Sequence, residues 1–260
     1  GDTLLVAGRE IPLQAVTLNV GVLYVFAMLS LGVYGVMMAG WSSANNYALL
    51  GGQRAAALMI SAEIGIGASI MGVVMWYGSL DLQEIVRGQG ALLFGWIPKW
   101  GLVTQPLAFV LFVTAGIAAT KRIPFDMPEG ESEIIGYFVE YSGMKFGMFA
   151  MADFLETVVI AGMTTSLFLG GWQVPYLVAE GFRFPWGAAW ALPHLVVVPL
   201  QVGAFVGKVC AVIFFMMLVR WTLPRFRYDQ AMRLGWLGLF PLSVLNIVLT
   251  GLLLLAWGAA

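Results

Sequence analysis

Four charged residues of the sequence lie inside long apolar stretches, where a charge is costly and therefore informative. They are three acids, Glu63, Asp153 and Glu156, and one base, Lys208. A charged side chain at the centre of a membrane helix costs about 2.5–3.5 kcal/mol on insertion scales, so such a residue suggests a function. Asp153 and Glu156 share a helix face at this spacing, and their repulsion favours protonation of one of them. We therefore expect the three acids to relay protons.

Structural roles are the alternative for these four residues. Buried ions can pair off to hold helices together, and long side chains can extend to the membrane surface. The acids outnumber the base, which favours a relay for Glu63, Asp153 and Glu156. For Lys208, helix packing and counter-charging of an acid are equally open. Glu63 is expected about a turn and a half into its helix, within reach of the cytoplasmic side.

The densest polar segment covers residues 121–141. Pro124 and Pro128 end the preceding helix, because proline donates no backbone N–H. Glu133, Tyr137 and Glu140 recur at helical spacing, which predicts one face of a short amphipathic helix. A solvated charged loop is the alternative, but the interleaved aromatic and glycine residues favour a packed loop that lines something. The acids of this segment are Asp126, Glu129, Glu131, Glu133 and Glu140.

Two further connections carry arginines. Residues 41–54 lead from Trp41 through small residues to Arg54, which places a cation at the membrane surface. Residues 220–230 hold Arg220, Arg225 and Arg227 beside aromatic residues. The usual enrichment of cations on the cytoplasmic side already explains part of that second cluster.

Long apolar segments must position all of these residues. The chain has 260 residues, of which 60% are hydrophobic and only 10% are charged, whereas about a quarter are charged in soluble domains. A spanning helix needs about 20 mostly apolar residues. We therefore expect an all-α, polytopic transmembrane bundle forming a single membrane domain over 1–260. Its six spans are expected at about 16–39, 57–78, 102–120, 146–170, 195–220 and 236–258.

The basic residues predict how these spans are oriented. Four lie in the connections of one side, and eight lie on the other: Arg54, Lys121, Arg122, Lys145, Arg220, Arg225, Arg227 and Arg233. Because basic residues favour the cytoplasm, the loops 40–56, 121–145 and 221–235 are expected to be cytoplasmic, with both chain ends on the far side.

Composition also restricts the chemistry. A net charge of −1 gives no large positive electrostatic field that would attract nucleic acid, and we expect no nucleic acid as a partner. One cysteine and one histidine exclude an iron–sulfur cluster or a bis-histidine haem held by this chain alone. We find no plausible metal-binding set and expect no catalytic residue that acts on this chain alone.

Three groups of motifs occur in a fixed order along the chain. They are GWSS (40–43), YALLGGQR (47–54) and ISAE (60–63), then PFDMPEGESE (124–133) and EYSGMKF (140–146), and last LPRFRYDQ (223–230). Over nearly the whole chain these segments resemble the quinone-site membrane subunit of respiratory complex I, which is the H-type subunit of NADH:quinone oxidoreductase.

This resemblance implies a helix bundle around a quinone cavity that couples quinone reduction to proton translocation. It implies a quinone cavity that includes Trp41, Arg54, Phe125, Asp126 and Tyr137. Proton coupling would fall to Glu63, Glu129, Glu131, Glu133, Glu140 and Asp153. Glu156 is added to that set from its spacing alone. Docking of the peripheral arm would involve Arg220, Arg225, Arg227 and Asp229.

The resemblance further implies that this chain binds no cofactor and that quinone is the substrate. Iron–sulfur clusters, FMN and NADH would reside on partner subunits. The implied partners are the quinone-site and iron–sulfur subunits of the peripheral arm, together with small and antiporter-like membrane subunits in the lipid bilayer. We expect a bacterial cell (inner) membrane in preference to the mitochondrial inner membrane.

Several features depart from the family pattern. Ala62 and Asp153 replace the family's usual Tyr and Glu, and the acidic loop is one residue shorter between Glu133 and Tyr137. Gly1 is not a methionine, and the family's first span, amphipathic surface helix and second span are missing. We therefore expect a fragment of about two thirds of the subunit, without the quinone portal.

Two other functions fit parts of the pattern. The membrane anchor of an energy-converting hydrogenase would share the buried acids and the docking face, but the complete quinone-family loops favour complex I. A stand-alone transporter using Asp153 and Glu156 would need inverted repeats or broken helices, and the sequence indicates neither.

Overall fold

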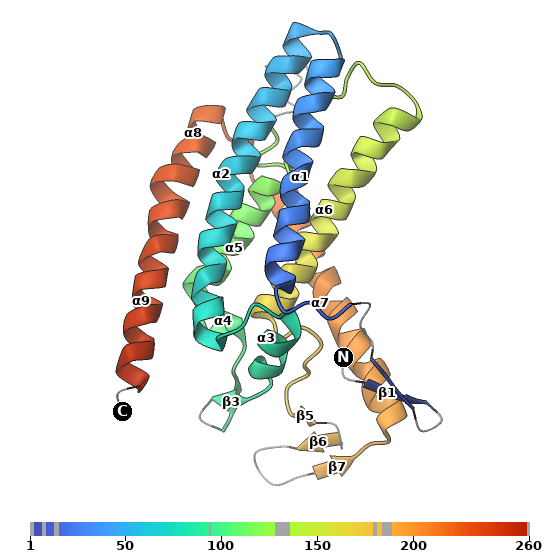
Figure 1. Cartoon of the computed structure of the whole chain (residues 1–260), viewed down its shortest axis with the longest axis vertical. Helices are drawn as coiled ribbons and strands as arrows, with labels where there is room; N and C mark the ends of the chain where they lie inside the picture. The colour runs from blue at the N-terminus through green and yellow to red at the C-terminus, as the bar shows by residue number, and fades with distance from the viewer. Residues whose placement is uncertain are drawn as a thin grey trace.

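The computed structural model describes residues 3–6, 9–12, 16–93, 95–127, 136–178, 181–183 and 189–258, as a bundle of helices with three small sheets at one end (Figure 1). The main helices are α1 (Gly21–Ser42), α2 (Asn46–Tyr77), α5 (Pro106–Ala119), α6 (Met144–Phe168), α7 (His194–Thr222) and α9 (Phe240–Gly258). Shorter elements are α3 (Leu82–Gln89), α4 (Gly101–Thr104), α8 (Tyr228–Arg233) and the π-helical turn η1 (Leu234–Leu239).

The strands form antiparallel ribbons beside α3 and α4, at what we call the sheet end (Figure 1). They are β1 (Thr3–Val6) with β2 (Arg9–Pro12), β3 (Leu92–Leu93) with β4 (Ile97–Pro98), and β5 (Leu177–Val178), β6 (Gly181–Arg183) and β7 (Ala189–Ala191). Both ends of the chain lie here. The opposite, loop end is made by the connections 43–45, 120–127, 136–143 and 223–227, where the more basic side was expected.

Among the described residues, five helical segments are long and apolar enough to cross a membrane: α1, α2, α6, α7 and the continuous run 228–256 through α8, η1 and α9. The sixth, α5, has 14 residues and is about 21 Å long at about 1.5 Å per residue. The expected all-α polytopic bundle is therefore confirmed, with five long spans and one short one.

The connection expected at 40–56 is mostly helical. Only residues 43–45 separate α1 from α2, and Asn45 caps α2 by accepting a hydrogen bond from the backbone N–H of Tyr47 at 2.9 Å. Gly52, which falls in the expected loop 40–56, lies within α2 at a point where α1 approaches closely. A Cβ on Gly52 would stand 3.3 Å from the carbonyl oxygen of Val36 on α1.

The span expected at 102–120 is broken. Helix α4 ends at Thr104, and α5 begins at Pro106, because a proline disfavours helical geometry in the residue before it. Gln105, the residue at the break, is buried and its side chain is hydrogen-bonded. Gln105 donates to Thr250 at 2.9 Å and accepts from Asn246 at 3.1 Å, which ties the start of α5 to α9.

Helix α5 lies between α2 and α6 and carries much of the core. Phe112 is fully buried and packs against Phe168 of α6 at a centroid distance of 5.3 Å. Gly116 permits the close approach of these helices, since a Cβ there would stand 2.7 Å from Cγ2 of Ile160. Large apolar side chains such as Phe154 and Leu237 instead point outward, as expected for a bundle solvated by lipid.

Candidate functional site

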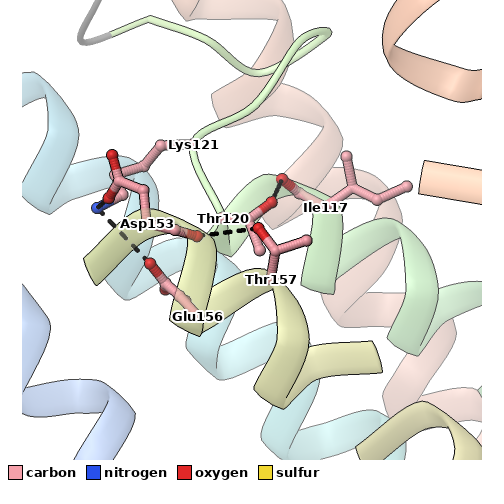
Figure 2. A network of polar contacts seen from close by, with 6 residues as sticks. All are labelled: Ile117, Thr120, Lys121, Asp153, Glu156 and Thr157. Carbon is pink, nitrogen blue, oxygen red and sulfur yellow. Dashed lines mark hydrogen bonds and ion pairs between the residues drawn. The ribbon is translucent and has the colours of Figure 1, made fainter. Parts of the chain in front are cut away.

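Lys121, expected in a cytoplasmic loop, is buried among acids. Its Nζ lies 2.8 Å from Oδ1 of Asp153 and 3.6 Å from Oε2 of Glu156, and the three side chains are 6%, 12% and 13% exposed. Figure 2 shows the lysine reaching the two carboxylates from the end of α5, while both acids project from α6. The prediction that Asp153 and Glu156 share a helix face is confirmed.

Backbone geometry at the end of α5 directs Lys121 inward. The helix ends at Ala119, and Lys121 adopts a left-handed conformation with φ of 54°. Non-glycine residues rarely adopt this region, which costs about 1–2 kcal/mol. The antiparallel packing of α5 on α6 at Gly116 and Ile160 then brings the next turns of both helices together, so Lys121 meets Asp153.

Opposing effects act on the charge of Lys121. Burial lowers the pKa of Lys121, whereas Tyr137, Glu156 and Asp153 raise it, and the net result is a pKa above the usual value. The ammonium therefore stays charged at neutral pH. The ring of Tyr137 also lies beneath it, with its centroid 6.0 Å from Nζ.

This charged cluster lies on the wall of a cavity of about 570 Å³ between α1 and α6. Most of the lining is aliphatic or aromatic, which suits an apolar molecule. Tyr137 is the expected quinone-cavity residue found on this wall, and it is fully buried. The polar lining residues are Lys121, Tyr137, Tyr141, Lys145, Asp153 and Glu156.

Glu63 lies deeper in its helix than expected. It stands 17 residues after Asn46, nearly five turns into α2, because α2 begins well before the predicted span. Its Oε2 accepts a hydrogen bond from Oγ of Ser30 on α1 at 3.0 Å. Its negative charge also acts on Glu156, so the three acids belong to one electrostatic group.

Lys208 does not counter-charge any of the acids expected as its partners. Its Nζ donates to the carbonyl oxygens of Leu169 at 2.7 Å, Gly171 at 3.0 Å and Gln173 at 2.6 Å, just after α6 ends. The ring centroid of Trp100 lies 4.5 Å away. Of the two roles left open for Lys208, the structure supports packing, with the ammonium at the negative end of a helix dipole.

Other expected quinone-cavity residues meet the expected docking segment. Phe125 is buried against Phe226 with ring centroids 5.3 Å apart, and Asp126 accepts from Arg225 at 2.9 Å. Arg54 stacks over the ring of Tyr228 at 5.1 Å. The segments 121–127 and 223–230 therefore form one surface with the start of α2.

The remaining expected residues lie at the loop end. Trp41 is 75% exposed in the last turn of α1. Arg220, Arg227 and Asp229 are exposed, and the last two pair at 3.0 Å. Glu140 is exposed and accepts from Asn45 at 2.7 Å.

Glu129, Glu131 and Glu133 lie outside the described residues. Residues 137–140 form turns, so the helix predicted from Glu133, Tyr137 and Glu140 is wrong over its described part. Tyr137 is buried, whereas Glu140 faces solvent, so the two do not share a face. The reason is that Tyr137 packs into the α1–α2 junction, with its Cβ 3.8 Å from where a Cβ on Gly52 would stand.

Lys121 is the member of the site that the sequence does not reveal. It directly precedes an arginine and a proline turn, so its spacing matches that of an ordinary loop cation. Across the part of the chain that the structure describes, no three His, Cys, Asp or Glu residues gather as metal ligands. The site as described therefore offers carboxylates, an ammonium and a phenol beside an apolar cavity, which suits proton exchange with an apolar ligand.

Comparison with known proteins gives a uniform result. A sequence model of the family described as NADH dehydrogenase matches residues 3–251. The H subunit of NADH-quinone oxidoreductase from Thermomicrobium roseum is 45% identical over 262 residues, covering 99% of this chain and 70% of that protein. An H subunit of the same enzyme from Geobacter metallireducens is 44% identical, covering 97% and 69%. One from Cytophaga hutchinsonii is 42% identical, covering 96% and 69%.

Proposed function

The chain belongs to the NADH dehydrogenase family as an H-type subunit, and we propose that it forms part of the quinone-binding cavity of a proton-pumping NADH:quinone oxidoreductase and couples quinone reduction to proton translocation. The resemblance inferred from the motifs is thereby confirmed at the level of the family. The relatives named above are all H-type subunits of NADH-quinone oxidoreductase, which favours this function over that of a hydrogenase anchor.

The observation that carries the proposal is the position of the charged cluster on the cavity wall. The apolar lining suits an isoprenoid chain, while Lys121, Asp153 and Glu156 offer charge at one place along it. Reduction of a quinone to a quinol consumes two electrons and two protons. Acids beside the cavity can supply or replace such protons without a redox group on this chain.

Partner subunits complete this function. Electrons would come from NADH through FMN and iron–sulfur clusters on the peripheral arm. The surface built from 121–127 and 223–230 is the proposed docking face for that arm, with Arg227 and Asp229 exposed on it and Arg220 exposed just before it in the chain. Small and antiporter-like membrane subunits would carry the effect further along a bacterial inner membrane.

Glu63→Gln in the assembled complex tests the function. This variant keeps the hydrogen-bonding shape of the side chain but removes its proton, so we expect inhibitor-sensitive quinone reduction and the associated proton uptake to fall together. Glu84→Gln is the matched control, because Glu84 is an exposed acid in the first turn of α3 at the sheet end. Wild-type turnover and an unchanged ratio of protons to electrons in Glu63→Gln would contradict the proposed role of Glu63.

A further inference from the structure

Lys121 is not among the residues expected to carry protons, yet its ammonium contacts two of them. We propose that Lys121 sets the proton occupancy of the carboxylate pair: it keeps Asp153 ionised and leaves Glu156 to take up and release a single proton. This inference rests on the proposed function and identifies how one part of the coupling works.

The two contacts of Lys121 are unequal. Its Nζ donates a hydrogen bond to Oδ1 of Asp153 at 2.8 Å, which is the usual length of a charge-assisted bond. Oε2 of Glu156 lies 3.6 Å from the same nitrogen, within ion-pair range but beyond a good hydrogen bond. Protonating Asp153 would sacrifice the stronger contact, so Glu156 is the carboxylate that binds a proton at lower cost.

The charges of the cluster limit it to one proton. With Lys121, Asp153 and Glu156 all ionised, their sum is −1, and one added proton makes the group neutral. A second proton would leave the ammonium of Lys121 without an ionised carboxylate in contact with it, among side chains that are nearly inaccessible to solvent, which is strongly unfavourable. The cluster therefore alternates between two states that differ by one proton.

The cavity supplies the route for that proton. Lys121, Asp153 and Glu156 all line it, so the cavity brings a proton donor within it next to Glu156. The donor loses the proton that Glu156 gains, no electron moves in this step, and the ammonium of Lys121 keeps its own three protons. Release reverses the same transfer when an acceptor occupies the cavity.

Other titratable groups also face the cluster. Glu63 on α2 is a third acid, and its charge acts on Glu156. Tyr137 and Tyr141, from the loop before α6, line the same cavity. Lys145 lies on the same cavity but is exposed, so water screens its charge.

The test is the pH dependence of quinone reduction by the complex, purified intact in mild detergent, with Lys121→Met, Lys121→Arg and Lys99→Met compared with the parent. Removing an opposite charge this close changes a carboxyl's proton affinity by about 1–3 pH units. We expect the pH optimum of Lys121→Met to move to higher pH by about one unit or more. Lys121→Arg should keep the parent optimum because it keeps the charge. Lys99→Met, which removes a cation over Trp76 rather than one between acids, should also keep it.

Each outcome decides the role of Lys121. A parent-like optimum in Lys121→Met, with or without a lower yield of complex, would show that the lysine only supports structure and would overturn the proposal. If Lys121→Met does not assemble, Glu156→Gln replaces it. Flattening of the pH profile then supports the proposal, and the parent profile overturns it. A parent complex unable to reduce quinone would instead defeat the proposed function, so the two failures are distinct.

Discussion

Two lysines of this chain contact polar groups at opposite ends of the bundle, and the charges of the two ammonium groups are stabilised in different ways. At the loop end, Lys121 lies between the carboxylates of Asp153 and Glu156. At the sheet end, Lys208 donates to three backbone carbonyls and lies over Trp100. Carbonyl oxygens do not titrate, so the partners of Lys208 have one protonation state. Carboxylates titrate, so the loop-end contact can have two. The role of a buried charge in a membrane protein is thus indicated chiefly by the chemical type of its partner.

The largest effect is expected from Asp153→Ala, which removes the closer partner of Lys121. Breaking a buried ion pair by removing one member costs about 3–5 kcal/mol, because a buried charge loses its counter-ion. We expect a marked fall in the yield of assembled complex and in its apparent Tm, together with loss of proton-coupled turnover. Native gel analysis and turnover per assembled complex measure the two effects separately. A fully stable and active Asp153→Ala complex would remove the basis for distinguishing the two lysines.

A smaller, purely structural effect is expected from Lys208→Met. The substitution leaves carbonyl acceptors after α6 without their charged donor, at a cost of about 1.5–3 kcal/mol. We expect a lower apparent Tm of the complex, while the ratio of protons pumped to electrons transferred stays at the parent value. Reconstituted vesicles with a pH-sensitive dye measure that ratio. A changed ratio would place Lys208 in the proton path and contradict the contrast drawn here.

The smallest effect is expected from Ser30→Ala, which removes the hydrogen bond from α1 to Glu63. One such bond contributes about 0.5–1.5 kcal/mol. Glu63 is half-buried and keeps its carboxylate in this variant. We expect turnover to fall less than in Glu63→Gln, and the pH optimum to stay near that of the parent. Equal loss in the two variants would show that Ser30 itself is part of the path.

The helical architecture was predictable because the length of each apolar segment follows directly from the residue types in the sequence. Long apolar runs identified α1, α2, α6, α7 and the final span without tertiary information. Element ends were less predictable, since they depend on local caps and close approaches such as Asn45 and Gly52. The break before α5 was signalled only by Pro106, inside a segment that otherwise appears as one span.

The site was predictable in part. Spacing on a single helix correctly grouped Asp153 and Glu156, because helical periodicity alone fixes which residues share a face. The contact of Lys121 depends on the packing of α5 against α6 and on a left-handed backbone, and neither is encoded in residue spacing. The partners of Lys208 are backbone carbonyls, which have no residue-type signature at all.

The wall shared by the cavity and the charged cluster has a thermodynamic consequence. Binding free energies at two linked sites are coupled reciprocally. If a ligand in the cavity raises the proton affinity of Glu156 by some factor, then protonation of Glu156 must raise the affinity of the cavity for that ligand by the same factor. A proton gradient imposed on the membrane would therefore alter how firmly the cavity holds its ligand. An arrangement of this kind runs in either direction, converting redox energy into a gradient or using a gradient to drive the reverse reaction.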